Sequence, residues 1–305
     1  MKISNPVYKE LLSLKIISKK NIIKISNKTR DKKIPVYRDI KSNVIFLGKY
    51  STDSKYYEAV KYKDQDRNVK KKNKEKIDYV KTSGGLIKTP ILEDDTRRVY
   101  QFKSLLRNKN ILDFGCGWGV FLSKLKNVKS KTGIELRDEC FFYIKKNLKK
   151  IFVTKNINNL NKNFDVITLF HVLEHIPYQV ETLKALKTKL SKNGKIIIEV
   201  PSAQDFLLSF KNFNSFKNFT FWSEHIILHT ENSLRKVLKK SGFKKINIIN
   251  YQRYNLNNHL GWFIEKKPGG HIFFKDVTDE TIKKNYIDYL KRNKKTHTLI
   301  AIASV

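Results

Sequence analysis

Residues 111–119 read Ile-Leu-Asp-Phe-Gly-Cys-Gly-Trp-Gly, an apolar strand that runs through Asp113 into a loop with three alternate glycines. Glycines at this spacing let the backbone approach a ligand where any Cβ would collide. The helix expected next, over residues 119–126, points its unpaired N–H groups toward the same place. The loop is therefore predicted to hold a cofactor.

The glycine spacing argues against one class of cofactor loop. The dinucleotide-binding pattern G-x-G-x-x-G would need a glycine at position 120, which is Val120. The third glycine comes one residue earlier, at Gly119, and Asp113 stands two residues before the first glycine. The spacing therefore argues against a dinucleotide.

Apolar strands and helical stretches alternate after the loop. Strands are expected at 131–136, 151–154, 164–170 and 195–200, and helices at 119–126, 139–150 and 180–190, with Asn193-Gly194 as a helix stop signal. This alternation predicts a parallel sheet, in which all strands end at one edge. Gly115, Glu135, Asn156 and His171 are predicted to meet at that edge, where open α/β sheets bind ligands.

The glycine loop with its preceding acid resembles motif I of the class I S-adenosylmethionine (SAM)-dependent methyltransferases. Residues 164–176 and Glu224-His225-Ile226 are similar to later segments of the group that includes the ubiquinone-pathway O-methyltransferases, and the likeness spans about residues 93–252. It implies a Rossmann-like α/β fold with a mostly parallel seven-stranded sheet whose last strand is antiparallel. It also implies SAM as cofactor, bound by Asp113, Gly115, Gly117, Gly119, Glu135, Asn156 and His171.

One residue of this set departs from the resemblance. The family usually has an Asp where this chain has Asn156, and that Asp accepts a hydrogen bond from the adenine amino group. The side-chain carbonyl of an Asn can still accept such a bond. Adenine contact is therefore still expected at Asn156.

The chain divides into three regions. Residues 1–92 are expected to form a small α+β accessory or lid region, with strands at 36–39 and 44–48 and a helix around Tyr56-Tyr57. The methyltransferase domain is expected over 93–305. Strands at 243–251 and 297–305 enclose residues 253–296, which are too long for a hairpin turn and are interpreted as an inserted substrate lid. This insertion resembles those in methyltransferases of surface-polysaccharide gene clusters.

The chain has 305 residues and a formal net charge of +35. The lysines are spread through every segment, and the densest run, Lys70–Lys76, has no aromatic residue for base stacking. The excess charge favours anionic substrates. Two cysteines, Cys116 and Cys140, are too few for a closed structural zinc site, so no metal is expected. No apolar run could cross a bilayer and no signal peptide is apparent, so a cytoplasmic location is expected.

Four histidines are candidates for a catalytic base. A base is needed if the methyl acceptor is a hydroxyl, and neutral histidine suits that task. His171 is expected to shape the methionine pocket, and His229 has no assigned role. His225 follows a loop rich in Phe and Trp and is the preferred base, with His175 as the second catalytic candidate.

Residues 171–175 also spell H-x-x-E-H, the pattern of an inverted zinc-protease motif. In that alternative His171 and His175 would bind zinc from one helix and Glu174 would act as base. The position directly after a strand, downstream of the glycine loop, argues against it.

Three main functions remain open from the sequence. The first is a methyltransferase for a small, anionic acceptor such as a nucleotide-linked sugar. The second is an RNA methyltransferase that holds phosphates with its positive charge. The third is a binding module that keeps the cofactor fold without catalysis.

Overall fold

The computed structural model describes residues 3–52, 79–82, 85–88 and 92–305. The helix expected around Tyr56-Tyr57 and the lysine run Lys70–Lys76 lie outside the described residues. The described residues belong to two compact units. One comprises those of Met1–Ser51, His171–Ala185 and Ile197–Ser304, and the other comprises those of Thr52–Phe170 and Leu186–Ile196.

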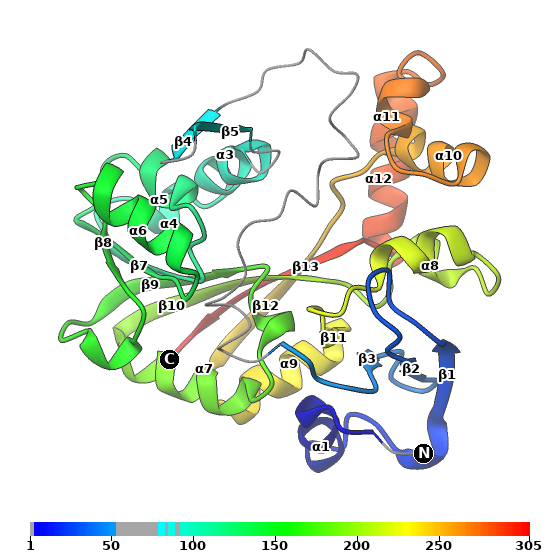
Figure 1. Cartoon of the computed structure of the whole chain (residues 1–305), viewed down its shortest axis with the longest axis horizontal. Coiled ribbons are helices and arrows are strands. Elements are labelled where there is room, and N and C mark those ends of the chain that lie inside the picture. Colours follow the sequence, from blue (N-terminus) through cyan, green and yellow to red (C-terminus); the bar gives the residue numbers. More distant parts are fainter. Residues whose placement is uncertain (1–2, 53–78, 83–84, 89–91) are drawn as a thin grey trace. The chain divides into compact units, whose positions relative to one another are not determined.

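The central sheet has seven strands in the order β12-β13-β10-β9-β6-β7-β8 (Figure 1). Strand β6 pairs in parallel with β7 and β9, β7 pairs in parallel with β8, and β12 pairs antiparallel with β13. This order confirms the predicted fold class. The strands are β6 Asn110–Phe114, β7 Ser130–Ile134, β8 Phe152–Thr154, β9 Phe164–Phe170, β10 Leu190–Pro201, β12 Lys244–Tyr251 and β13 Thr298–Ser304.

The central strands are runs of apolar residues whose side chains are buried. Leu112 in β6, Ile167 in β9 and Ile197 in β10 have no exposed surface. Such continuous apolar runs are typical of parallel strands covered on both faces. The helices are α3 Leu92–Gln101, α4 Lys103–Leu106, α5 Val120–Lys124, α6 Asp138–Asn147, α7 Gln179–Thr188 and α9 Glu231–Lys240.

The boundary between α7 and β10 differs from the prediction. The helix ends at Thr188, and the strand begins at Leu190, so Asn193-Gly194 lies inside the strand and is not a helix stop. Asn193 is exposed, which lets a polar turn residue occupy a strand position. At Gly194 a Cβ would come within 2.9 Å of the Leu190 side chain, so glycine here serves close packing.

The predicted N-terminal strands belong to a second sheet, with order β1-β2-β3-β11. Its strands are β1 Ile22–Ser26, β2 Val36–Asp39, β3 Ile45–Leu47 and β11 Ile227–Leu228. Helix α1, Pro6–Ser13, starts at Asn5, whose Nδ2 donates to the carbonyls of Leu47 and Ile226 at 2.9 and 3.0 Å. The N-terminal residues are therefore tied to a segment more than 200 positions away. Strands β4, Tyr79–Thr82, and β5, Gly85–Lys88, pair separately.

The segment 253–296 forms three helices, α10 Leu256–Glu265, α11 Gly270–Phe273 and α12 Glu280–Arg292. Before them lie the 3-10 turn η5, Phe206–Ser209, and helix α8, Asn214–Thr220. Helices α10 and α11 approach so closely that a Cβ on Gly261 would lie 2.5 Å from the Cα of Gly270. Among the described residues, no helix is long and apolar enough to cross a membrane.

Candidate active site

The glycine loop bends sharply where β6 ends. Gly115, Gly117 and Gly119 have φ angles of +77°, +52° and +72°, a region that other residues adopt only with strain. The amides of Gly115 and Cys116 both donate to the carbonyl of Ile134, at 2.8 and 3.0 Å. The end of β7 therefore fixes the path of the loop.

Gly117 and Gly119 serve different purposes. A Cβ on Gly119 would press against Ile144 and Leu148 of the α6 region at 3.1 Å, so this glycine permits helix packing. A Cβ on Gly117 would have no atom within 4 Å. The loop backbone at Gly117 thus borders open space, as a cradle for a ligand requires.

Glu135 lies directly beside the loop. Its Oε2 accepts a hydrogen bond from the Gly117 amide at 2.7 Å and its Oε1 accepts one from the Arg137 amide at 2.9 Å. The carboxylate is buried. Each carboxylate oxygen can accept a further bond, so Glu135 can also bind the hydroxyls of a ribose. Here the structure brings two predicted site residues together.

Asp113 faces the interior of its unit. Its Oδ1 accepts a hydrogen bond from Thr168 Oγ1 at 2.7 Å, which links β6 to β9. Burial raises the pKa of Asp113 to about 7, although the bond from Thr168 opposes the change. Asp113 therefore anchors the end of β6 to β9, just before the glycine loop begins. The sequence had not singled out Thr168, because it is an ordinary strand residue until its partner is known.

Asn156 is the N-cap of the short helix η3, Ile157–Asn159, and its side chain accepts from the Asn158 amide at 2.9 Å. The side chain is exposed, at the end of the strand next to β7. Contact with a cofactor base remains a prediction for this residue.

His171 follows β9 in a left-handed backbone conformation, with φ of +55°. Its Nδ1 lies 3.1 Å from Glu174 Oε1 and its Nε2 lies 3.3 Å from Glu199 Oε1. Burial disfavours the charged ring, but the bonds to the two carboxylates outweigh it and raise the pKa to about 9. His171 is a cation at neutral pH with both ring nitrogens engaged.

A second group of side chains begins at Glu174, three residues after His171. Ligand-type atoms of Glu174, His175 and His225 lie within 4.8 Å of one another. The two histidine rings are 4.9 Å apart, centre to centre, and Trp222 packs edge-on against His225 at 5.2 Å. Glu224 Oε2 lies 4.0 Å from His175 Nδ1. We call Glu174, His175 and His225 the histidine cluster.

The chain was compared with known proteins. The methyltransferase-domain family matches residues 91–248, about half of the chain. The chain belongs to the SAM-dependent methyltransferases. The glycine loop and Glu135 fit that cofactor, because the space over Gly117 is open and a buried carboxylate stands beside it.

The sequence identity between this methyltransferase and its individual relatives is low. The chain is 24% identical to the tRNA U34 carboxymethyltransferase of Campylobacter fetus, over 69% of the chain and 80% of that protein. It is 30% identical to the mitochondrial ubiquinone biosynthesis O-methyltransferase of Saccharomyces cerevisiae, over 29% of the chain and 32% of that protein. A crystal structure of a SAM-dependent methyltransferase from Archaeoglobus fulgidus superposes with a TM-score of 0.48 and 19% identity, over 70% of the chain and 94% of that protein.

The protonation states in the methyltransferase's histidine cluster differ sharply. Burial, helped by the neighbouring His175, lowers the pKa of His225 to about 3, so its ring is neutral at pH 7. Burial alone would raise the pKa of Glu174, but the bond to His171 and the nearby histidines lower it to about 2. Glu174 is fully buried, and none of the described residues forms a hydrogen bond with its Oε2. A neutral base and a fixed negative charge therefore stand side by side.

The H-x-x-E-H alternative is wrong in its geometry. Only Leu173–His175 is helical, as the 3-10 turn η4, and His171 precedes it with a left-handed backbone. His171 and His175 are therefore not presented by one helix, and both His171 nitrogens face carboxylates. The ligand types of the histidine cluster could hold a divalent cation. His229 lies outside it, with Nδ1 3.0 Å from Ser233 Oγ.

Two acids of this region, Glu199 and Glu224, were not predicted as site residues. Glu199 lies one residue before the expected end of its strand, and Glu224 directly precedes His225 in the sequence. The position of Glu224 beside a candidate base was a usable signal. Nothing in the local sequence links Glu199 to His171, because that contact depends on the pairing of distant segments.

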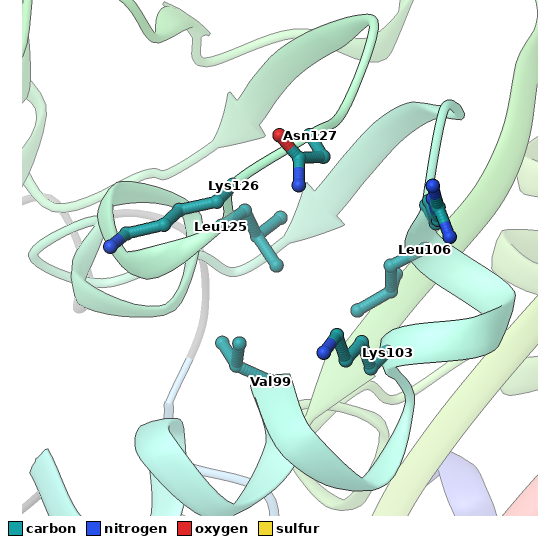
Figure 2. Close-up of a pocket in the computed structure, with 7 residues that line it drawn as sticks. Val99, Lys103, Leu106, Leu125, Lys126 and Asn127 are labelled. Carbon is teal, nitrogen blue, oxygen red and sulfur yellow. The ribbon is translucent and has the colours of Figure 1, made fainter.

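A hollow of about 230 Å³ lies elsewhere, between α3, α4 and the turn after α5. Figure 2 shows Val99, Leu106 and Leu125 among its lining residues. Asn127, also in the lining, is joined to Asn108 just before β6 begins. The hollow is thus at the opposite end of β6 from the glycine loop, and we assign it no part in cofactor binding.

Proposed function

We propose that this methyltransferase transfers a methyl group to a small, anionic acceptor, such as a nucleotide-linked sugar or another precursor of a surface polysaccharide. The observation that carries the chemistry is the histidine cluster, in which His175 and a neutral His225 stand beside the negative charge of Glu174. The neutral ring is a weak base, so it would accept the proton of the acceptor hydroxyl as the bond to the methyl group forms and makes that proton strongly acidic. The excess of positive charge on the chain favours an anion.

The cofactor residues have distinct proposed roles. Glu135 would accept hydrogen bonds from the ribose hydroxyls, and Gly115, Gly117 and Gly119 would let the backbone approach the cofactor. Asp113 would hold the loop in place. When bound, SAM supplies a methyl group already activated on a sulfonium. The protein then mainly positions the acceptor and excludes water, which can lower a barrier by roughly 7–11 kcal/mol.

His225 is the proposed base. His225 would take the hydroxyl proton as the acceptor oxygen replaces the sulfonium sulfur on the methyl carbon. The negative charge of Glu174, whose Oε2 has no hydrogen-bond partner among the described residues, would favour the resulting imidazolium. His175 would orient the ring of His225, which it meets edge to face. His171, charged and held by Glu174 and Glu199, would shape the methionine pocket from the end of β9.

A panel assay tests this proposal. Purified protein is incubated with methyl-labelled SAM and, separately, with nucleotide sugars, free sugars and total tRNA. We expect label in a nucleotide sugar or a related anionic small molecule. Label in none of the small molecules would contradict the proposal.

RNA is the second candidate acceptor. Two observations favour it, the net charge of +35 and a relative named for tRNA that aligns over 69% of the chain. Label in tRNA, with binding that weakens steeply as salt rises, would establish it, because each neutralised phosphate adds to the salt dependence. Small-molecule methylation would show much weaker salt dependence.

A further inference from the structure

A cluster of aromatic rings covers part of the first unit. Phe210 and Phe263 lie 5.2 Å apart, centre to centre, and Phe263 stacks nearly parallel to Phe213 at 5.3 Å. Trp262 contacts Phe216 at 5.0 Å and Phe219 at 4.9 Å. These rings come from the η5–α8 region and from α10, in the yellow-green and orange parts of Figure 1. We call these six residues the aromatic cluster.

The aromatic cluster has a buried side and an open side. Phe216 and Trp262 are buried, whereas Phe210, Phe219 and Phe263 expose 39%, 44% and 39% of their surface. Single exposed aromatic residues are common in proteins, but several in one contiguous group mark a binding surface. The buried rings hold the exposed ones in place, so their surfaces are fixed before any ligand arrives.

Two cations lie beside this cluster without a negative partner. Lys217, between Phe216 and Phe219 on α8, donates to the carbonyl of Lys211. Arg38, from β2, donates to the carbonyl of Leu208 at 3.3 Å. Among the described residues, no carboxylate pairs with Arg38 or Lys217. Residues 206–223 contain two lysines and no acid at all.

The two cations are partly removed from water, and the charge of Arg38 acts on Lys217. Burial, and then the charge of Arg38, lowers the pKa of Lys217. The Nε of Arg38 is buried and has no hydrogen-bond acceptor in the part of the chain that the structure describes. Two desolvated positive charges side by side are unfavourable unless an anion joins them. An oxyanion of a ligand would supply the negative charge that none of the described residues places beside these cations.

We propose that the aromatic cluster, together with Arg38 and Lys217, binds the nucleotide part of the methyl acceptor. The base would stack on an exposed Phe ring, and a phosphate would lie beside the two cations. This assignment rests on the proposed function and deepens it, because it separates a recognition site for the nucleotide from the histidine cluster. Stacking on Phe tolerates any base, so the ring contacts select for a nucleotide and not for one base.

A free nucleotide fits this surface better than RNA does. A surface for single-stranded RNA follows the phosphate backbone with a track of cations. Here Arg38 and Lys217 bind carbonyls on either side of Phe210, and two cations are enough for one or two phosphates. The three exposed rings likewise offer a short platform.

Titration with uridine diphosphate tests the inference. The full-length protein is titrated with uridine diphosphate, uridine and inorganic pyrophosphate, and binding is followed by calorimetry and by saturation-transfer NMR. We expect uridine diphosphate to bind more tightly than either part alone. Phe219→Leu, which keeps an apolar side chain on an exposed position, and Lys217→Gln should each weaken binding about tenfold. The matched controls Phe273→Leu and Lys284→Gln change exposed residues outside the cluster and should bind as the wild type does.

Three results would overturn the inference. They are no binding of uridine diphosphate, equal binding by Phe219→Leu and the wild type, and a strong preference for a uridine oligonucleotide or for lipid vesicles. Because Phe219 is exposed, its variant remains informative even if Lys217→Gln fails to fold. Titration with S-adenosylhomocysteine in parallel separates the two proposals. If that product binds and uridine diphosphate does not, only the nucleotide site fails; if it does not bind, the proposed function fails.

Discussion

The glycine loop and the histidine cluster show two ways in which a chain builds a site. Gly117 and Glu135 are 18 residues apart and meet through one hydrogen bond across the ends of adjacent strands. His175 and His225 are 50 residues apart in the sequence and meet only because distant segments fold together. The loop depends on backbone conformation, whereas the cluster depends on side-chain packing.

The two regions also treat a buried carboxylate in opposite ways. Asp113 has one hydroxyl partner and nearby acids, so burial prevails and raises its pKa to about 7. Glu174 is equally buried but faces three histidines, and its pKa falls to about 2. Surroundings, and not burial alone, determine which acid is charged at neutral pH. The histidine cluster therefore places a negative charge beside a neutral ring.

Replacing the proposed base should have the largest effect. In His225→Ala, kcat with the acceptor found by the labelled-donor panel should fall by about 10²–10⁴, the usual contribution of a general base. The affinity for S-adenosylhomocysteine should stay within about twofold. Rate measurements and calorimetry on the same preparation check both values. His271→Ala, at an exposed histidine on α11, is the control, and an equal loss of rate and cofactor affinity in His225→Ala would refute the division between the two regions.

Acid should destabilise the unit that holds the buried histidines. Burial lowers the pKa values of His229 and His259 to about 4 and that of His297 to about 3. In the unfolded chain these histidines bind protons below about pH 6.5, whereas in the folded chain they stay neutral. Their contribution to stability is therefore complete above that pH and is lost as pH falls toward 4. Each histidine contributes about 1.4 kcal/mol per pH unit in this window.

Urea unfolding at pH 7, 6 and 5 measures this effect. In His259→Gln, the free energy of unfolding should change with pH by about 1.4 kcal/mol per pH unit less than in the wild type. The same pH dependence in His259→Gln and in the wild type would show that the His259 ring is not held neutral.

Two alanine substitutions in the loop should have the smallest effects. Gly117→Ala and Gly119→Ala both place a Cβ at positive φ, which costs about 1–2 kcal/mol of stability. Gly119→Ala also presses on Ile144 and Leu148 and should be the less stable of the two. Gly117→Ala fills the open side of the loop and should bind S-adenosylhomocysteine about tenfold more weakly. Thermal unfolding and calorimetry compare the pair; equal cofactor affinities would mean that the open space is not the cofactor cradle.

Most of the fold could be predicted from the sequence, because its signals are local. Apolar runs and the βα alternation predicted the parallel strands, and the resemblance to methyltransferases added the seven-stranded sheet with its antiparallel last strand. The start of β10 was misplaced because Asn193-Gly194 is a turn signal that tertiary packing overrides. The N-terminal strands were expected, but their union with Ile227–Leu228 was not, since no local pattern encodes a pairing across 180 residues.

The sequence was less informative about the histidine cluster. It identified His175 and His225 as candidates but gave no sign that their rings meet, or that Glu174 and Glu199 hold His171. It indicated an α-helix through His171 and His175 for the metal alternative, where the chain has a left-handed residue and a single 3-10 turn. Such contacts follow from the folded arrangement of β9, β10 and the segment before β11.

Calorimetric titration of S-adenosylhomocysteine into the wild type and Glu135→Gln tests the role of the glycine loop most directly. We predict one site per chain in the wild type and at least about tenfold weaker binding in the variant, because a neutral amide loses charge-assisted hydrogen bonds to the ribose. Equal affinity in both proteins would contradict the account, since the carboxylate beside Gly117 would then hold no cofactor.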